Sequence, residues 1–143
     1  MNTDIEKEFE GCKLIAYKDS VGVLTIGYGH TLGVYEGQVI TQEKADGYLL
    51  SDLHTAINAV ESLVKSPLTD EEKSALVDLV FNIGQGNFAH STLLRLLNSG
   101  DYEEAAQEFL RWNRGGGVVL AGLTRRRAAE SEMFKRGLAN GQT

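Results

Sequence analysis

The stretch EGCKLIAYKDSVGVLTIGYGH, residues 10–30, decides how the first part of this chain folds. Residues 14–17 and 23–28 are apolar runs with high β-propensity, and the short segment between them contains a glycine. This pattern is typical of a β-hairpin. We therefore predict two short antiparallel strands, with Asp19 in the turn and Thr25 on the returning strand.

A short helix is predicted directly before these strands. Residues 3–10 place Ile5 and Phe9 four positions apart, on one face of a helix, and Gly11 follows as a stop signal. Glu10 then lies in the last helical turn, where the helix dipole disfavours a negative charge. This position suits a carboxylic acid that donates a proton.

Glu10, Asp19 and Thr25 together meet the needs of glycosidic bond hydrolysis. That reaction uses one carboxylic acid to protonate the leaving oxygen and one carboxylate to activate water or stabilise the oxocarbenium-like transition state. Glu10 and Asp19 can fill these roles, and Thr25 adds a hydroxyl for the water. Taken singly, each residue also has a structural interpretation, as a solvated helix-end carboxylate, a turn residue and a β-branched strand residue.

The same stretch resembles a known family. Residues 10–31, read as EGxxLxAYxDxxGxxTIGYGHT, look like the phage-type lysozymes, or endolysins, of glycoside hydrolase family 24, and most like the lambdoid type. Further matching segments are FNIGxGNF at 81–88, STLLR at 91–95 and GLxxRR at 122–127. The resemblance therefore covers nearly the whole chain.

This resemblance implies a muramidase that cleaves the β-1,4 bond between N-acetylmuramic acid and N-acetylglucosamine in peptidoglycan, for phage- or prophage-driven lysis of the host cell. By resemblance, Glu10 is the acid, and Asp19 with Thr25 holds the attacking water, so we expect inversion of configuration. The alternatives are a lytic transglycosylase and a non-catalytic cell-wall-binding module. Both agree less well with a complete set of acid, carboxylate and hydroxyl.

Further residues of the site follow from the same resemblance. Phe81 and Asn82 match a pair that lines the substrate cleft in the family. An arginine at the start of the last helix is implied to face the catalytic acid, and Arg126 and Arg127 are the two candidates. Trp112 is expected in the core.

The histidines and the cysteine carry little chemistry. His30 is expected to be structural or to contact substrate. Because His30, His54 and His90 have neither ligand spacing nor an acidic or cysteine cluster around them, we predict no metal site and no cofactor. The single cysteine, Cys12, cannot form an internal disulfide, and we expect a small buried residue, with cysteine-based control of the active site as the alternative.

Composition limits the partners. The chain has 143 residues, 42% of them hydrophobic, and a net charge of −6, which fits one globular domain. Residues 1–94 hold 6 basic and 14 acidic residues, whereas residues 95–143 hold 8 and 6. An acidic chain of this kind binds nucleic acid poorly. No apolar run is long enough for stable membrane insertion, and we expect a monomer that acts on peptidoglycan glycan strands.

The predicted fold is α+β, mostly helical and, by resemblance, lysozyme-like. We expect one domain over 1–143, with a small sheet lobe at about 12–40, a connecting helix at about 41–65, and a larger helical lobe at about 66–143 on which the helix 3–10 packs. Further helices are predicted over 69–84, 91–97, 101–112 and 124–138, with residues 115–117 as a flexible loop. Thr41, Thr69, Asp101 and Thr124 are the predicted N-terminal caps.

The expected location follows from the same features. The N-terminus is acidic and lacks the basic and apolar regions of an export signal. We expect the protein to accumulate in the host bacterial cytoplasm before lysis and to act on the cell wall in the periplasm. Because several members of the family carry an N-terminal signal-anchor, such a segment before Met1 is also compatible with the sequence.

Overall fold

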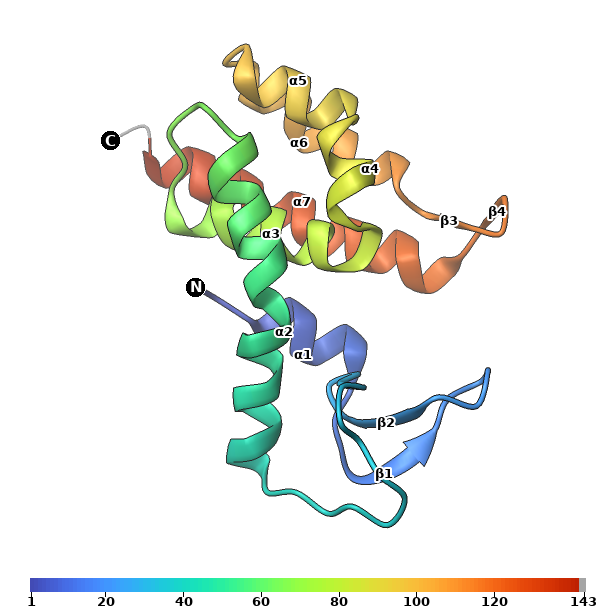
Figure 1. Ribbon diagram of the computed structural model, residues 1–143. Coiled ribbons are helices and arrows are strands. Elements are labelled where there is room, and N and C mark those ends of the chain that lie inside the picture. The colour runs from blue at the N-terminus through green and yellow to red at the C-terminus, as the bar shows by residue number, and fades with distance from the viewer. Residues whose placement is uncertain (142–143) are drawn as a thin grey trace. The chain divides into compact units, whose positions relative to one another are not determined.

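A computed structural model describes residues 1–141 of the chain. The protein is mostly helical, with a small two-stranded sheet near its N-terminus, as the sequence predicted (Figure 1). It divides into two compact units: a smaller unit of residues 6–54, and a larger unit of residues 1–5 together with the chain from Thr55 onward. No helix within the described residues has both the length and the apolar character needed to cross a membrane.

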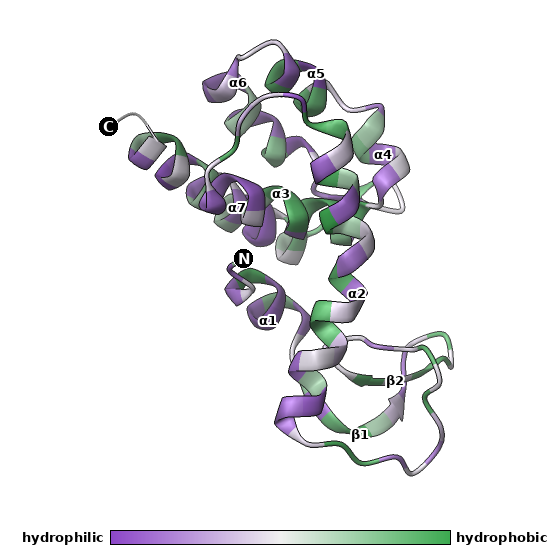
Figure 2. Cartoon of the chain, turned by 60° about the vertical axis from the view of Figure 1, so that its left-hand side comes forward, coloured by the Kyte–Doolittle hydropathy of each residue, from purple (hydrophilic) through white to green (hydrophobic). Residues whose placement is uncertain are grey.

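The smaller unit contains most of α1 (Asp4–Glu10) and the sheet. Strand β1 (Lys13–Lys18) pairs antiparallel with β2 (Leu24–Gly27), and Tyr17 lies opposite Thr25. The register shifts between Lys13 and Tyr17, so β1 carries a bulge. Both strands were predicted, and both are largely hydrophobic (Figure 2).

The chain then passes along the free side of β1 before it enters the long helix. The backbone N–H of Ala16 donates to the carbonyl of Gln38, and that of Ile40 donates to the carbonyl of Leu14, each over 2.9 Å. Residues 38–40 therefore protect the edge of the hairpin.

Helix α2 (Gln42–Leu63) begins directly after Thr41, whose hydroxyl accepts a hydrogen bond from the backbone N–H of Lys44, as predicted for an N-terminal cap. Within the smaller unit, β2 packs closely on this helix. A Cβ atom on Gly27 would lie 3.4 Å from the Cβ of Ala45, and Gly27 has φ of +64°. Glycine at this position therefore allows both the turn after β2 and its contact with α2.

Two helices form the centre of the larger unit. Helix α3 (Asp70–Ile83) lies along α7 (Ala121–Gly141) (Figure 1), and the middle of α3 is almost entirely buried. The predicted capping box of Thr69 and Glu72 is present at the start of α3. A Cβ atom on Gly137 would lie 2.5 Å from the hydroxyl oxygen of Thr69, so the two helices can approach this closely only because residue 137 is glycine.

The remaining elements of the larger unit are short. In chain order they are α4 (Gln85–Ala89), α5 (Thr92–Asn98), α6 (Tyr102–Glu108), a 3₁₀ turn (Phe109–Arg111), and the strands β3 (Arg114–Gly115) and β4 (Val118–Val119). Ser91 caps α5 by accepting a hydrogen bond from the backbone N–H of Leu94.

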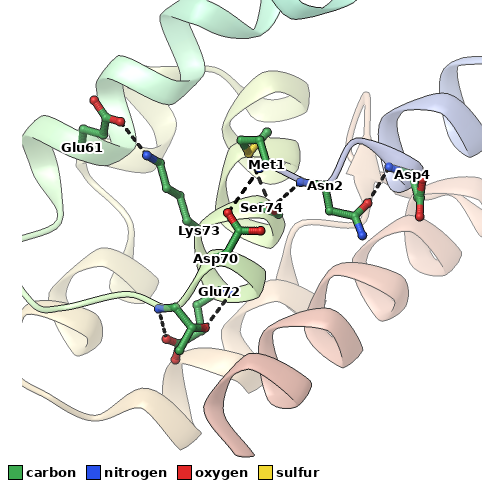
Figure 3. A network of polar contacts seen from close by, with 9 residues as sticks. Met1, Asn2, Asp4, Glu61, Asp70, Glu72, Lys73 and Ser74 are labelled. Carbon is green, nitrogen blue, oxygen red and sulfur yellow. Dashed lines mark hydrogen bonds and ion pairs between the residues drawn. The ribbon is translucent and has the colours of Figure 1, made fainter. Parts of the chain in front are cut away.

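The first residues of the chain are fixed to α3 (Figure 3). The amino nitrogen of Met1 lies 3.3 Å from Oδ1 of Asp70, and the backbone N–H of Asn2 donates to Oγ of Ser74 over 2.9 Å. These contacts are why residues 1–5 belong to the larger unit although the rest of α1 belongs to the smaller one.

The larger unit differs from the prediction in several places. Trp112, which was expected in the core, is half-buried. The loop predicted over 115–117 is shorter in the structure: Gly115 is paired in β3, and Gly116 and Gly117 adopt positive φ in the turn of the β3–β4 hairpin. Helix α4 was not predicted, because its five residues contain a glycine and two amides. The helix predicted over 101–112 ends at Glu108, and the side chain of Asp101 makes no capping hydrogen bond.

A further error concerns the last helix. Thr124 does not cap it, because α7 already begins at Ala121. The hydroxyl of Thr124 instead donates to the carbonyl of Leu120, four residues earlier, which is a common bond for threonine inside a helix. Glycine disfavours helix, so Gly122 made an earlier start of this helix look improbable from the sequence. In the structure Gly122 lies in the first turn of α7.

Candidate active site

Asp19 lies in the turn of the β1–β2 hairpin and is held by the main chain. Its Oδ1 atom accepts the backbone N–H groups of Val21 and Val23 over 3.0 and 2.9 Å. Its backbone N–H also donates to the carbonyl of Val23 over 2.9 Å. Within residues 1–141, no protein group bonds to its Oδ2 atom. One carboxylate oxygen therefore fixes the side chain, and the other is available to accept a proton.

Thr25 projects from β2 and is 4% exposed. Its hydroxyl donates to the carbonyl of Val23 over 2.9 Å. A threonine hydroxyl has one hydrogen and two lone pairs, so with its hydrogen in this bond Oγ1 is an acceptor for other groups. Asp19 and Thr25 are thus both oriented by the main chain of one residue, Val23.

Glu10 is the last residue of α1 and is half-buried. Its carboxyl lies beside Gly29: a Cβ atom built on Gly29 would lie 3.3 Å from Oε2 of Glu10. Gly29 also has φ of +85°, a conformation that favours glycine. The glycine of the GYGH segment therefore leaves space for the carboxyl of Glu10.

We expect Gly29→Ala to reduce lytic activity by roughly 10- to 100-fold, because small displacements of a reacting group have effects of that size. The added methyl would press on Oε2 of Glu10. The matched control is Gly37→Ala, because Gly37 has φ of +82° and nothing within 4 Å of its Cβ position. Both variants should lose about 1–2 kcal/mol of unfolding free energy from backbone strain. Equal activities of the two purified variants in a turbidity assay would contradict this role of Gly29.

His30 is bound on both ring nitrogens within the smaller unit. Nδ1 lies 2.9 Å from Oδ2 of Asp52, and Nε2 lies 2.8 Å from the carbonyl oxygen of Leu32. The ring stacks on Tyr48 with centroids 4.0 Å apart. His30 therefore ties the chain after β2 to α2, and a contact with sugar stays a prediction.

A buried group of charges lies between α3 and α7 in the larger unit. Arg126 donates from Nε and Nη2 to the two oxygens of Asp78 over 2.9 and 2.7 Å, a bidentate pair. Arg127 Nε lies 2.9 Å from Oε1 of Glu130, and its Nη2 donates to Oδ1 of Asn82 over 2.8 Å. Both arginines are buried, and each is paired with an acid.

Burial perturbs two members of this group. It raises the pKa of the Glu130 carboxyl well above its ordinary value, and a hydrogen bond with Asp78 and the charge of Asp78 add to the rise. Burial also lowers the pKa of the Arg127 guanidinium, against the attraction of Glu130 and Asp78.

The candidate residues fall into two sets. Glu10, Asp19, Thr25 and His30 all lie in the smaller unit, whereas Phe81, Asn82, Arg126 and Arg127 all lie in the larger one. Phe81 is half-buried, and Asn82 is exposed. No group of three His, Cys, Asp or Glu residues that could hold a metal ion exists in the described part of the chain.

The expectation of a buried Cys12 was wrong. Its side chain is exposed, and its thiol donates a weak hydrogen bond to Oε1 of Gln42 over 3.9 Å. The residue follows Gly11 in the connection from α1 to β1, where little chain is available to cover it.

Three features of the site were missed from the sequence. The backbone of Val23 orients Asp19 and Thr25, the glycine at 29 accommodates the acid, and Asp52 holds His30. The repeated glycines of GYGH could have indicated that residue 29 must be small. The sequence gives no local signal for Asp52, because 22 positions separate it from His30.

Comparison with known proteins identifies the family and supports the fold. The family model described as "Phage lysozyme" matches residues 7–130. The endolysin of Acyrthosiphon pisum secondary endosymbiont phage 1 is 42% identical over 90% of this chain and 91% of its own length. The endolysin of Bacillus phage B103 is also 42% identical, over 92% of this chain, but the chain spans only 51% of that relative. A crystal structure of a mutant lysozyme from phage P22 is 42% identical and superposes with a TM-score of 0.86 over 92% of both chains.

Proposed function

The chain belongs to the phage lysozyme family, and from this premise we propose that it hydrolyses the β-1,4 bond between N-acetylmuramic acid and N-acetylglucosamine in peptidoglycan. Endolysins of this family are glycoside hydrolases that serve host cell lysis. The cell wall is therefore the place of action, and we expect access to it from the periplasmic side.

One observation carries the proposal. A single compact unit, residues 6–54, contains an acid at a helix end, a carboxylate with one fixed and one available oxygen, and a hydroxyl oriented by the same backbone as that carboxylate. An inverting glycosidase needs an acid, a base and a positioned water. Glu10, Asp19 and Thr25 supply the protein groups for all three tasks.

The proposed reaction is a single displacement. Glu10 donates its proton to the glycosidic oxygen as the bond to the anomeric carbon breaks. A water molecule attacks that carbon from the opposite face, and its proton passes to Oδ2 of Asp19. Oγ1 of Thr25 accepts the second hydrogen of the water, because its own hydrogen is engaged with the carbonyl of Val23. Bond cleavage and water attack thus use separate groups.

The remaining family-based assignments are part of the same proposal. We propose that Phe81 and Asn82 contact sugar and that Arg126 or Arg127 pairs with Glu10, where a guanidinium would stabilise the carboxylate left after proton donation. We also propose that the two units act as a single catalytic domain. A monomer would suffice, because all the proposed catalytic residues come from one chain.

The stereochemistry of the product tests the displacement. We expect the first product formed from a soluble muropeptide oligomer to carry an α-anomeric reducing end, because a single displacement inverts the β bond. The carboxyls of Glu10 and Asp19 should then lie roughly 6.5–9.5 Å apart in the substrate-bound enzyme, whereas a retaining pair lies at about 5–5.5 Å. Proton NMR during the first minutes, before mutarotation, distinguishes the anomers.

The same reaction mixture tests the competing activities. An initial β product would make Asp19 the nucleophile of a double displacement. A 1,6-anhydro sugar, detected by product mass, would identify a lytic transglycosylase, which needs one acid and no positioned water. Binding to cell walls without any product would identify a wall-binding module.

A further inference from the structure

Gln42, the first residue of α2, bonds to three other side chains of the smaller unit through one amide group. Its Nε2 atom donates to Oη of Tyr28 over 3.1 Å and to Oδ1 of Asp46 over 3.0 Å. Its Oε1 atom accepts the weak hydrogen bond from the thiol of Cys12 over 3.9 Å. A glutamine amide has two hydrogens to donate and one oxygen that accepts. Both hydrogens and the oxygen are used here, so Gln42 links separate parts of the chain although it is exposed.

Two of the residues bonded to Gln42 belong to segments that flank Glu10. Cys12 follows Glu10 by two positions, in the connection from α1 to β1. Tyr28 directly precedes Gly29, the residue whose missing side chain leaves space for the carboxyl of Glu10. Tyr28 is 8% exposed, and a buried tyrosine hydroxyl usually needs a hydrogen-bond partner, which Gln42 supplies. Gln42 therefore connects the start of α2 to the chain after Glu10 and to the chain beside it.

Asp46 extends these connections to α1. The same Oδ1 atom that accepts from Gln42 lies 3.8 Å from Nζ of Lys7. Lys7 precedes Glu10 by three positions on α1, so the two side chains are neighbours on the helix surface. The Lys7 and Asp46 side chains are 40% and 41% exposed, and an exposed ion pair of this kind contributes little by itself. Its value here is that it adds the helix before Glu10 to the segments joined at Gln42.

We propose that Gln42 is a positioning residue for the proposed catalytic acid. By bonding Tyr28, Asp46 and Cys12 at once, it holds the segments around Glu10 in one arrangement, so that the carboxyl is presented to the glycosidic oxygen at a constant distance. A displacement of about 1 Å at a reacting group can cost roughly 100-fold in rate. The inference rests on the proposed function, and it adds a residue that lies outside the 10–31 segment.

Gln42→Glu tests this role without changing the size of the side chain. A carboxylate at position 42 cannot donate, and it would face the carboxylate of Asp46, so an attractive contact becomes a repulsive one. An acidic residue in the first turn of a helix interacts favourably with the helix dipole, so we expect α2 and the fold to persist. The matched control is Gln38→Glu, which makes the same change of charge in the smaller unit. Oε1 of Gln38 accepts the backbone N–H of Tyr35 over 3.3 Å, and a carboxylate can accept that bond as well.

We expect Gln42→Glu to lower kcat for peptidoglycan by roughly fivefold to twentyfold and to leave KM within about twofold of the parent. A displaced acid weakens the transition state, whereas sugar binding in the ground state does not depend on it. Gln38→Glu should keep the parental kcat, and circular dichroism of both variants verifies the fold. A kcat of Gln42→Glu within twofold of the parent, a change confined to KM, or an equal loss of kcat in Gln38→Glu would each overturn the proposal.

A second substitution separates positioning from general damage. Gln42→Glu/Asp46→Asn exchanges donor and acceptor, because the amide introduced at 46 can donate to the carboxylate introduced at 42, and the hydroxyl of Tyr28 can donate to it as well. We expect this double variant to recover kcat to within about threefold of the parent. A double variant no faster than Gln42→Glu would mean that the bonds of residue 42 do not set the rate, and the proposal would be wrong.

NMR spectra provide a measurement that does not depend on hydrolysis. Gln42→Glu should shift the backbone amide signals of Glu10 and Gly29, whereas Gln38→Glu should leave both signals in place. Unchanged signals in Gln42→Glu would contradict the positioning role. If the parent hydrolyses no peptidoglycan, the proposed function is wrong, whereas the spectra still decide whether Gln42 orders the chain around Glu10.

Discussion

Replacing Glu10 with glutamine is expected to abolish lysis while leaving the fold intact. Glutamine keeps the size of the side chain and its space beside Gly29 but cannot protonate the leaving oxygen. General-acid catalysis contributes roughly 10²–10⁴-fold to a reaction rate, and we expect a loss in that range. The measurement is the fall in turbidity of Gram-negative cells whose outer membrane has been made permeable, with circular dichroism to verify the fold.

Glu8→Gln is the matched control for this experiment. Glu8 lies on the same short helix, is exposed, and undergoes the same change of charge. We expect it to keep the parental rate. If correctly folded Glu10→Gln lysed cells within threefold of the parent, Glu10 would not be the acid, and a loss in Glu8→Gln equal to that in Glu10→Gln would point to charge on α1 rather than to proton donation.

The smaller unit could be predicted from the sequence because its determinants are local. The apolar runs on either side of Asp19 indicate the hairpin, and Thr41 indicates the start of the long helix, where it forms the predicted N-terminal cap. The three proposed catalytic residues lie within 16 positions of one another. Because these residues are close in the sequence, their spacing alone could suggest a catalytic site.

The larger unit was less predictable because tertiary contacts override its local signals. Three successive glycines suggest an open loop, but the backbone N–H of Leu120 bonds to the carbonyl of Asn113 and closes a hairpin. The run of arginines on α7 looks like a solvated surface, yet Arg127 is among the most completely buried side chains of the described residues. Arg127 is buried beside Asp78 of α3 and Glu130 of α7. Asp78 is far from Arg127 in the sequence, so no local pattern could indicate this burial.

The second large effect concerns that buried arginine. We expect Arg127→Met to lower the free energy of unfolding by about 3–5 kcal/mol, because removing one partner of a buried ion pair leaves the other without compensation. Arg127 and Glu130 are both 0% exposed, and Asn82 would lose its bond from Nη2 as well. Denaturant unfolding at a fixed pH measures the change.

The loss should grow with pH, and its sign follows from the raised pKa of Glu130. A carboxyl with a raised pKa in the folded state contributes stability that is present below the pKa of the unfolded chain and is lost as pH rises through the folded value. The charge of Arg127 opposes that rise, so removing Arg127 raises the pKa of Glu130 further. The variant therefore continues to lose stability up to a higher pH than the parent does. The deficit of Arg127→Met relative to the parent should therefore be larger near neutral pH than near the ordinary pKa of a glutamate.

A double variant separates the lost charge pair from lost packing. Arg127→Met/Glu130→Met removes both buried charges and keeps apolar volume, and such replacements are often neutral or stabilising. We expect it to recover at least half of the stability lost by Arg127→Met and to show little of its added pH dependence, since Glu130 no longer titrates. A double variant no more stable than the single one would mean that Arg127 acts mainly through its bond to Asn82 and its packing between α3 and α7. A single variant within about 1 kcal/mol of the parent would contradict the size expected for a buried pair.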